Sequence, residues 1–240
     1  MFGKVASFEF GYQLKNPVLW ITFIAFFLLT FGSVTNDFIQ IGSAGNVNIN
    51  SPFAIINTMA IMAIFGQFAV VAFVANIVIR DDETGFAPMI RATQIKKFDY
   101  LFGRFTGAFL ASIIIMLAIP LAMIIGSFMP WLDPERLGPL VLWHYVYAFA
   151  TAALPTLFLC ACMFFALATV TRSMMATYLG VIAFFILYIV LSSLFARPEF
   201  EQAVALLEPY GIGALFDATR YWTASDRNTM VPPLSGLYFG

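Results

Sequence analysis

Arg80 to Arg104 read RDDETGFAPMIRATQIKKFDYLFGR, and nine of these 25 residues are charged. Before this segment lie 42 uncharged residues (38–79), and after it lie 28 (105–132). A membrane-spanning helix needs about 20 consecutive, mostly apolar residues. The pattern therefore predicts two spanning helices joined by a large charged loop (80–104) at the membrane surface.

The composition of the whole chain agrees with this local pattern. Hydrophobic residues make up 61% of the 240 residues and charged residues 10%, whereas globular proteins average about 45–50% and about 25%. The net charge of −1 gives no electrostatic basis for binding nucleic acid. We therefore expect an all-α, polytopic bundle that contacts the lipid bilayer and binds no nucleic acid.

Apolar runs on both sides of the charged loop predict five spanning helices within a single transmembrane domain, 1–240. The third and fourth runs contain Pro120 and Pro155, which spanning helices tolerate when neighbouring groups satisfy the freed carbonyl. We expect a kink at Pro155. The predicted spans are about 17–35, 53–79, 105–131, 145–170 and 174–196.

Lys and Arg placement predicts the orientation of these spans, because cytoplasmic loops carry an excess of basic residues. A cytoplasmic N-terminus puts eight basic residues inside and four outside. We therefore place the N-terminus and the loop 80–104 in the cytoplasm. The inner set is Lys4, Lys15, Arg80, Arg91, Lys96, Lys97, Arg104 and Arg172, and the outer set is Arg136, Arg197, Arg220 and Arg227.

Both ends of the chain are predicted to lie at the membrane surface. Residues 1–16 carry aromatic side chains on one broad side and are expected to form an interfacial helix. The tail 197–240 contains two helix-like pieces, Pro198 to Glu208 and Ile212 to Ala224, each too short to cross the bilayer. We expect them on the outer surface or dipping partway in. Residues 234–239 are apolar again and resemble the start of an incomplete sixth span.

The charged loop divides into an acidic first part and an apolar second part. Asp81 and Asp82 suit the N-terminus of a helix, where acidic groups meet the positive end of the dipole. Phe86, Met89 and Ile90 then supply apolar side chains among basic ones. Exposed apolar groups rimmed by charge are typical of a docking surface, and a solvated surface turn is the alternative.

Small and polar residues inside the spans predict how the helices pack. Gly103, Gly107 and Ala111 recur at four-residue spacing, which lets helix backbones approach closely within the subunit or at a dimer face. We interpret the polar residues as hydrogen-bonding glue between helices, although Gln67 and Asn76 could instead line a path through the membrane. The polar set is Asn57, Thr58, Gln67, Asn76, Thr151, Thr156 and Thr177.

Catalytic motifs are missing from the sequence. His144 is the only histidine, which leaves too few parts for a zinc site or a Ser-His-Asp triad. The five predicted spans contain no Asp, Glu, Lys or Arg, the residues on which ion-coupled carriers depend. The chain also lacks a GxxxxGK[ST] phosphate loop. We therefore expect no enzyme activity and no cofactor in this chain, and any ATP must be bound by another polypeptide.

The charged loop resembles the coupling segment of ABC-2 type transporter permeases. In that family the second span is followed by an acidic stretch, a Gly and a short apolar helix. The third span is preceded by a basic pair, an acidic-aromatic pair and a Gly-basic pair. The matching elements are Asp82–Glu83, Gly85, Met89–Ile90, Lys96–Lys97, Asp99–Tyr100 and Gly103–Arg104. The opening FEFGYQLKNPVLW and the tail LLEPYGIGALFDATRYWTASDRN are similar to the family's N-terminal interfacial helix and outer helices.

The resemblance covers essentially the whole chain and is closest to a branch in which the permease continues into an M1-type metallopeptidase domain. No HExxH motif occurs here, so no peptidase activity is assigned. Phe86 replaces the Thr that is common after the Gly, and the sixth span is absent, so the chain looks truncated.

The resemblance implies a permease in the bacterial inner membrane that pairs with a second copy or a homologous half. A separate ABC ATPase subunit would power the movement of a solute, in the direction of export. The implied ATPase-coupling residues are Asp82, Glu83, Gly85, Phe86, Met89, Ile90, Lys96, Lys97 and Asp99. The alternative hypothesis is a membrane scaffold or assembly protein that docks a soluble partner through the same loop and transports nothing.

Overall fold

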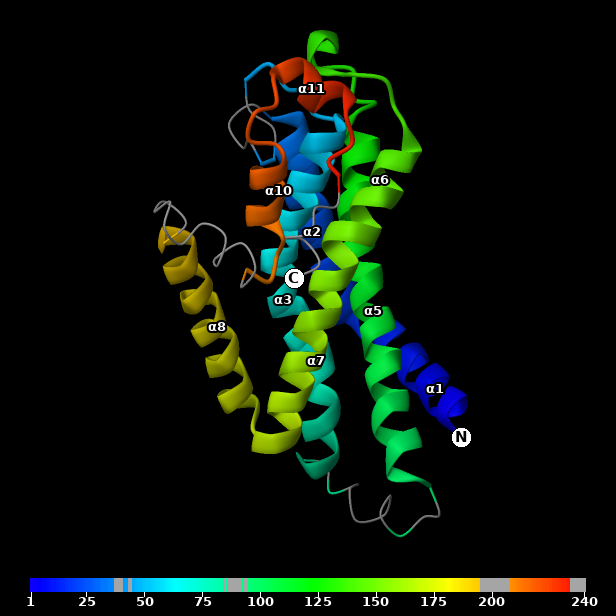
Figure 1. The fold of residues 1–240 in the computed structure, drawn as a ribbon. Helices are drawn as coiled ribbons and strands as arrows, with labels where there is room; N and C mark the ends of the chain where they lie inside the picture. The colour runs from blue at the N-terminus through cyan, green and yellow to red at the C-terminus, as the bar shows by residue number, and fades with distance from the viewer. Residues whose placement is uncertain are drawn as a thin grey trace. The chain divides into compact units, whose positions relative to one another are not determined.

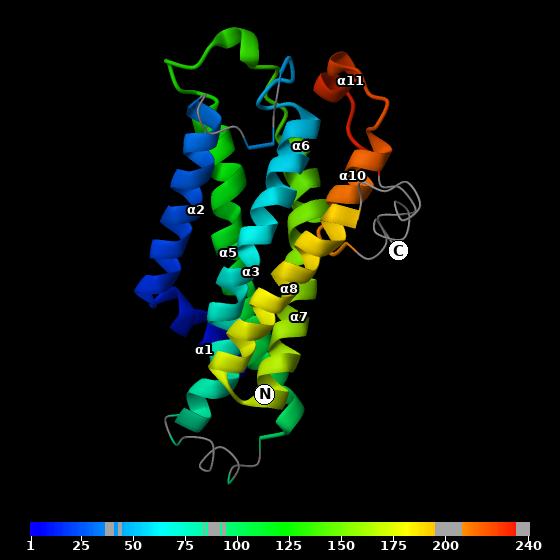
Figure 2. The same ribbon diagram turned by 90° about the vertical axis from the view of Figure 1, so that its left-hand side faces the viewer.

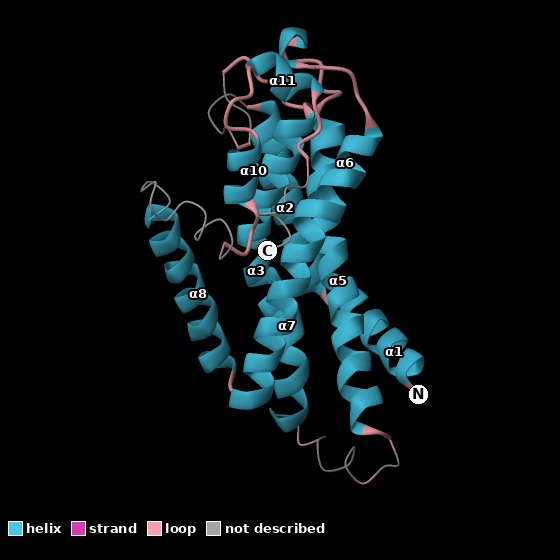
Figure 3. Cartoon of the chain, viewed as in Figure 1, coloured by secondary structure: helices cyan, strands magenta, loops and turns pink. Residues whose placement is uncertain are grey.

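The computed structural model describes residues 1–36, 41–42, 45–83, 85, 92, 95–194 and 208–233. The secondary structure of this part is helical throughout, without a β-strand (Figures 1 and 3). Five helices are long and apolar enough to cross a membrane, which confirms the predicted all-α class and identifies an integral membrane protein. They comprise Pro17–Thr35, Pro52–Arg80, Lys97–Gly126, Leu142–Thr171 and Met174–Ser193.

The observed helices extend past several predicted ends of the spans. The third span begins at Lys97 rather than at residue 105, because helical hydrogen bonding continues through the charged positions that limited the sequence-based assignment. It ends at Gly126 rather than at residue 131. The elements are α1 (Phe2–Leu14), α2 (Pro17–Thr35), α3 (Pro52–Glu83), α5 (Lys97–Gly126), η1 (Pro134–Arg136), α6 (Leu142–Ala148), η2 (Phe149–Ala153), α7 (Leu154–Thr171), α8 (Met174–Leu194), α10 (Ile212–Ala218) and α11 (Ala224–Thr229).

Local signals explain where the first two long helices begin. Asn16 accepts a hydrogen bond from the N–H of Val18 (3.0 Å), and Pro17 occupies the first helical position of α2. Ser51 accepts one from the N–H of Ala54 (3.2 Å), and Pro52 begins α3. A side-chain cap followed by proline satisfies the free amide groups of a helix start and fixes its first φ angle.

The described chain forms two compact units, and five of its helices (α2, α3, α5, α7 and α8) each contribute to both of them. Unit 1 comprises Met1–Phe23, Gly66–Ile115 and Leu157–Phe185. Unit 2 comprises Ile24–Phe65, Met116–Thr156 and Ile186–Gly240. The two units are therefore built from different stretches of the same long helices.

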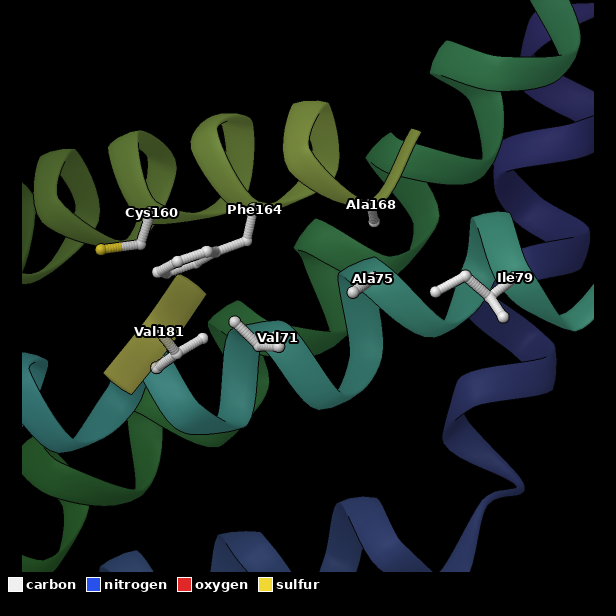
Figure 4. Close-up of a cluster of buried hydrophobic side chains, with 7 residues drawn as sticks. All are labelled: Val71, Ala75, Ile79, Cys160, Phe164, Ala168 and Val181. Atoms are coloured by element: carbon white, nitrogen blue, oxygen red, sulfur yellow. The ribbon is translucent and has the colours of Figure 1, made fainter. Parts of the chain in front are cut away.

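The core of unit 1 is an apolar cluster between α3 and α7, to which α8 adds one side chain (Figure 4). Both helices contribute residues at four-residue spacing, which places them on one helical face. Small side chains at several of these positions let the helices approach, and the ring of Phe164 lies between them. The cluster consists of Val71, Ala75, Ile79, Cys160, Phe164, Ala168 and Val181.

Unit 2 is held together at one end by asparagine side chains. Asn50 donates to the carbonyl of Gly138 and accepts from its N–H, both at 2.7 Å. Asn228 accepts from the N–H of Asn48 (2.7 Å) and donates to the carbonyl of Asn46 (3.1 Å). Side-chain amides can donate and accept at once, so Asn50 joins two loops that are distant in sequence, and Asn228 joins α11 to the loop before α3.

The described tail helices pack inside unit 2. Phe216 of α10 contacts Phe53 at the start of α3, with ring centroids 6.3 Å apart. The predicted helix Ile212 to Ala224 ends at Ala218 instead, and after a turn a further helix, α11, begins at Ala224 with Thr223 as the N-cap of a capping box. The predicted piece before Glu208 and the apolar residues 234–239 lie outside the described residues.

Pro155 lies in the second position of α7, directly after a π-helical turn (η2). Proline has no N–H to give to the carbonyl four residues earlier, and its ring crowds that carbonyl. A wider π turn is a common way to absorb such a mismatch inside a long helix. The irregularity expected at Pro155 therefore appears as a local change of helix type.

The polar residues of the spans take several different partners. Asn57 and Thr58 donate to the carbonyls of Gly42 (2.9 Å) and Ile41 (3.1 Å), in the segment that precedes α3. Thr151 and Thr177 instead donate to carbonyls four residues back on their own helices. The predicted interhelical role is therefore wrong for these two threonines, since an α-helix offers its own carbonyls to a hydroxyl.

Gln67 is buried within α3 and Asn76 is partly exposed.

Candidate functional site

The structure shortens the loop that the sequence placed between Arg80 and Arg104. Helix α3 continues to Glu83, and α5 begins at Lys97. Asp81 and Asp82 are therefore in the last turn of α3, and the prediction that they begin a helix is wrong. The hydrogen-bonded helix simply continues through the acidic run.

The predicted coupling residues fall partly outside the described chain. Phe86, Met89 and Ile90 lie outside the described residues, and Asp82 and Glu83 are described only as part of the backbone of α3. Gly85 has a positive φ of 68° and is exposed, a conformation that glycine adopts without a steric penalty.

The described end of the loop presents its basic pair to solvent. Lys96 and Lys97 are exposed, and Asp99 is partly exposed near the N-terminal amine of Met1, 3.7 Å away. An ion pair this exposed contributes little to stability. These residues are therefore accessible for contacts outside the chain.

A fully buried carboxylate lies at the base of this loop. Glu9 of α1 has no solvent exposure. Its Oε2 accepts hydrogen bonds from Arg80 at 2.8 Å and from Arg104 at 3.1 Å, and its Oε1 accepts one from Gln13 at 2.9 Å. We call these four residues the Glu9 cluster. It joins three segments, because Arg80 is near the end of α3 and Arg104 is near the start of α5.

Two glycines on α5 allow α1, which carries Glu9, to pack closely against α5. A Cβ atom on Gly107 would lie 2.7 Å from the carbonyl oxygen of Ala6 and 2.7 Å from the Cβ of Glu9. On Gly103 it would lie 3.0 Å from the Cβ of Val5. The predicted seam residues Gly103 and Gly107 therefore face α1 within the subunit. The third seam residue, Ala111, is fully buried one turn further along.

Aromatic rings surround the two arginines. The guanidinium of Arg80 lies 4.2 Å from the centre of the Tyr12 ring, and that of Arg104 lies 5.3 Å from the Tyr100 ring. Arg104 also donates a hydrogen bond to the Tyr100 hydroxyl. Cation–π contacts favour guanidinium groups that are partly removed from water. The rings therefore help to hold both cations beside the carboxylate.

Burial makes the Glu9 cluster sensitive to the loss of any member. The Arg104 side chain is 6% exposed and the Arg80 side chain 21%. Removing one partner from a buried ion pair typically costs about 3–5 kcal/mol, because a charge is left without compensation in a poorly solvated place. The cluster thus links α1, α3 and α5 in one arrangement.

The cluster is suited to joining helices and offers no obvious chemistry on a substrate. Both oxygens of its carboxyl group already accept hydrogen bonds from side chains of the cluster, and Glu9 has no solvent exposure. Within the described ranges, no group of three His, Cys, Asp or Glu side chains is placed to hold a metal ion.

Sequence reasoning missed Glu9 because it treated residues 1–16 as a helix against the lipid surface. One signal was present: Ala6, Glu9 and Gln13 are spaced three and four apart and share a face. On this face the acid Glu9 lies between a small residue and an amide, and exposed aromatic residues such as Phe8 lie on the opposite face. This pattern indicates a face that packs on protein. The arginine partners could not be assigned without the fold.

In comparisons with known proteins, no protein-family model and no curated protein matches this chain.

Proposed function

We propose that this chain is the membrane-spanning permease component of an ABC-2 type transporter, which exports a solute with energy from a separate ATPase subunit. The proposal rests on the resemblance of the segment from Asp82 to Arg104 to the coupling segment of that family. The described residues include five helices long and apolar enough to span a membrane, which supports a membrane-spanning component. The bacterial inner membrane is the location that the resemblance implies.

The structural observation that supports the coupling part of the proposal is the place of the Glu9 cluster at the two ends of the charged loop. Arg80 precedes the loop by one turn of α3, and Arg104 follows it within two turns of α5. Both guanidinium groups bind the same oxygen of Glu9. A displacement of the loop must therefore act on α3, α5 and α1 together or break a buried ion pair.

This arrangement suggests how ATP-driven movement would reach the membrane. Closure of an ATPase below the loop would push on the segment from Asp82 to Lys97. Helices transmit such a push along their axes because their hydrogen bonds are internal. The close contact at Gly107 and the ion pairs of Glu9 would then carry the displacement to α1. A second permease copy or homologous half would complete the path for the solute.

Docking is the first step to test. The full chain would be co-expressed with the ATP-binding subunit encoded beside it and purified in detergent. Replacing both Met89 and Ile90 with Asp should abolish co-purification, because charges would replace the apolar contact groups. Replacing Leu140, an exposed apolar residue of unit 2, with Asp is the matched control. Unchanged docking of the double variant would remove the coupling assignment.

A second measurement separates a transporter from a scaffold that merely anchors the ATPase. In the complex, amide exchange in α1 would be compared with and without ATP. The permease proposal expects an ATP-dependent change in α1 that shrinks in the Glu9→Gln variant, while docking persists. Docking with no ATP-dependent change in α1, α3 or α5 would favour the scaffold and overturn the proposed coupling.

A further inference from the structure

Unit 2 contains a partly buried carboxyl group, Glu208, one oxygen of which is buried. Glu208 precedes Pro209, Tyr210 and Gly211 in the turn that leads into α10. Its Oε2 accepts a hydrogen bond from the N–H of Gly213, and the N–H of Ile212 also bonds to the carboxyl group. The side chain therefore folds back over the start of the following helix.

The other carboxyl oxygen of Glu208 is buried without any hydrogen-bond partner in the described part of the chain. An ionised carboxylate spreads its charge over both oxygens and needs donors at each. A buried acceptor left without a donor costs about 1–3 kcal/mol, and more when it is charged. The site is thus built to stabilise one oxygen and to penalise a full negative charge on the other.

The turn that carries Glu208 packs tightly against two helices. Tyr210 is 1% exposed and meets the ring of Tyr188 of α8 edge-on, with centroids 4.7 Å apart. The hydroxyl of Thr156 of α7 donates to the carbonyl of Pro209 at 3.4 Å. Releasing Glu208 to solvent would move this turn, so the state of the carboxyl group is linked to both contacts.

Burial and hydrogen bonding act on Glu208 in opposite directions. Burial disfavours the charged form and raises the pKa of the carboxyl, whereas the amide groups of Gly213 and Ile212 lower it. Burial is the larger effect, so the pKa of Glu208 is raised above its ordinary value. The acid therefore binds its proton more tightly in the packed turn than it does in water.

Among the residues that the structure describes, few titratable groups face this carboxyl. From α8, Tyr188 interacts with it electrostatically. From α7 the neighbour is the neutral Thr156, and α10 contributes its backbone amides. Tyr147 lines a small cavity beside Tyr210 and Gly211 and donates its hydroxyl proton to the carbonyl of Pro232 (2.9 Å). The groups named here are tyrosines, a threonine and backbone amides, so Glu208 is the carboxylic acid among these described groups.

We propose that Glu208 is a proton-binding site, and that a bound proton holds the turn 208–211 against α7 and α8. Loss of the proton leaves a negative charge on a carboxyl group whose Oε1 is buried and has no hydrogen-bond partner among the described residues, which favours release of the turn to water. The small cavity beside Tyr210 and Gly211 provides space next to the turn for that movement. Unit 2 thereby contains an element whose packing depends on pH.

The linkage between proton binding and packing has a definite sign. The pKa of Glu208 is higher in the packed turn than in the released one, so the packed turn binds more protons. Its stability is fully present below the pKa of the released carboxyl and is lost as the pH rises through the higher pKa of the packed form. Between these two values the opening equilibrium increases tenfold for each pH unit.

Amide exchange of Ile212 and Gly213 measures this opening directly. The full chain would be studied in lipid nanodiscs over a range of pH, with rates corrected for intrinsic exchange. In the wild type, protection of these amides should fall with rising pH by up to tenfold per unit. Glu208→Gln, which stays neutral, should keep its protection constant. Glu135→Gln removes an exposed carboxyl from the same unit and should keep the wild-type fall.

Two results would overturn the proton site. One is a Glu208→Gln variant whose Ile212 and Gly213 amides lose protection with rising pH as those of the wild type do. The other is a wild type whose Ile212 and Gly213 amides show no fall while the amides of α6 remain protected as an internal reference. The wild-type comparison does not depend on whether the variant folds.

Discussion

Truncation of Glu9 should separate α1 from the rest of unit 1. In Glu9→Ala, Arg80 and Arg104 lose their shared carboxylate acceptor. Breaking a buried pair costs about 3–5 kcal/mol. Because the side chain of Arg80 is 21% exposed, water can recover part of this cost. We therefore expect a loss near the lower end, about 3 kcal/mol.

Glu9→Gln should cost less, because the amide keeps an acceptor oxygen for the arginines and loses the charge. Hydrogen bonds to a charged group are worth about 1.5–3 kcal/mol and neutral ones about 0.5–1.5 kcal/mol. The expected loss is therefore about 1–2 kcal/mol. In double-mutant cycles with Gln in place of each arginine, Arg104 should couple to Glu9 more strongly than Arg80, because it is more deeply buried.

Reversible unfolding in mixed detergent micelles would measure these free energies, and amide exchange of α1 would locate the change. Glu135→Ala is the matched control, since it removes an exposed carboxylate. If Glu9→Ala lowers stability no more than this control, and α1 keeps its protection, the Glu9 cluster does not hold α1. The assignment of α1 as a coupled element would then fail as well.

Three other substitutions test the packing and the capping of the chain. Gly107→Ala adds a methyl group against the backbone of α1 and should lower the free energy of unfolding by about 1–3 kcal/mol in the same assay. Gly3→Ala, whose methyl group meets open space, should cause no such loss. Asn50→Ala loses two hydrogen bonds and should cost about 1–3 kcal/mol, whereas exposed Asn46→Ala should cost little. Hydrogen bonds within its capping box lower the pKa of Asp226, so the cap is complete at neutral pH and is lost as the pH falls through that lowered pKa. Asp226→Asn should remove this pH dependence from amide exchange in α11.

The five spans were predictable because membrane insertion depends on composition over about 20 residues, which a sequence displays directly. Their ends were less predictable. A charged residue marks the edge of an apolar run, but it does not end a helix when it finds a partner. Arg104 lies two turns inside α5 because Glu9 neutralises it. Arg80 extends α3 in the same way.

The apolar pattern of the tail does not indicate whether it forms one helix or two. Thr223 and Asp226 form a capping box that begins α11, a local signal that the sequence contains. The position of α10 against Phe53 depends on α3, which lies far away in the sequence. The seam of Gly103 and Gly107 was visible as spacing, but its partner, α1, became identifiable only in the fold.

Stability alone does not account for a carboxylate buried between two arginines. Well-packed apolar residues in place of a buried ion cluster are often as stable or more so. The hydrogen bonds of the two arginines to Glu9 differ in that their strength depends on direction as well as on distance, so a small shift or rotation of the partners weakens them. The energy of the Glu9 cluster therefore differs between a docked and a displaced α1, whereas apolar contacts alone would let the helices slide. Placed at the two ends of the charged loop, the Glu9 cluster is therefore sensitive to small displacements of α1, α3 and α5.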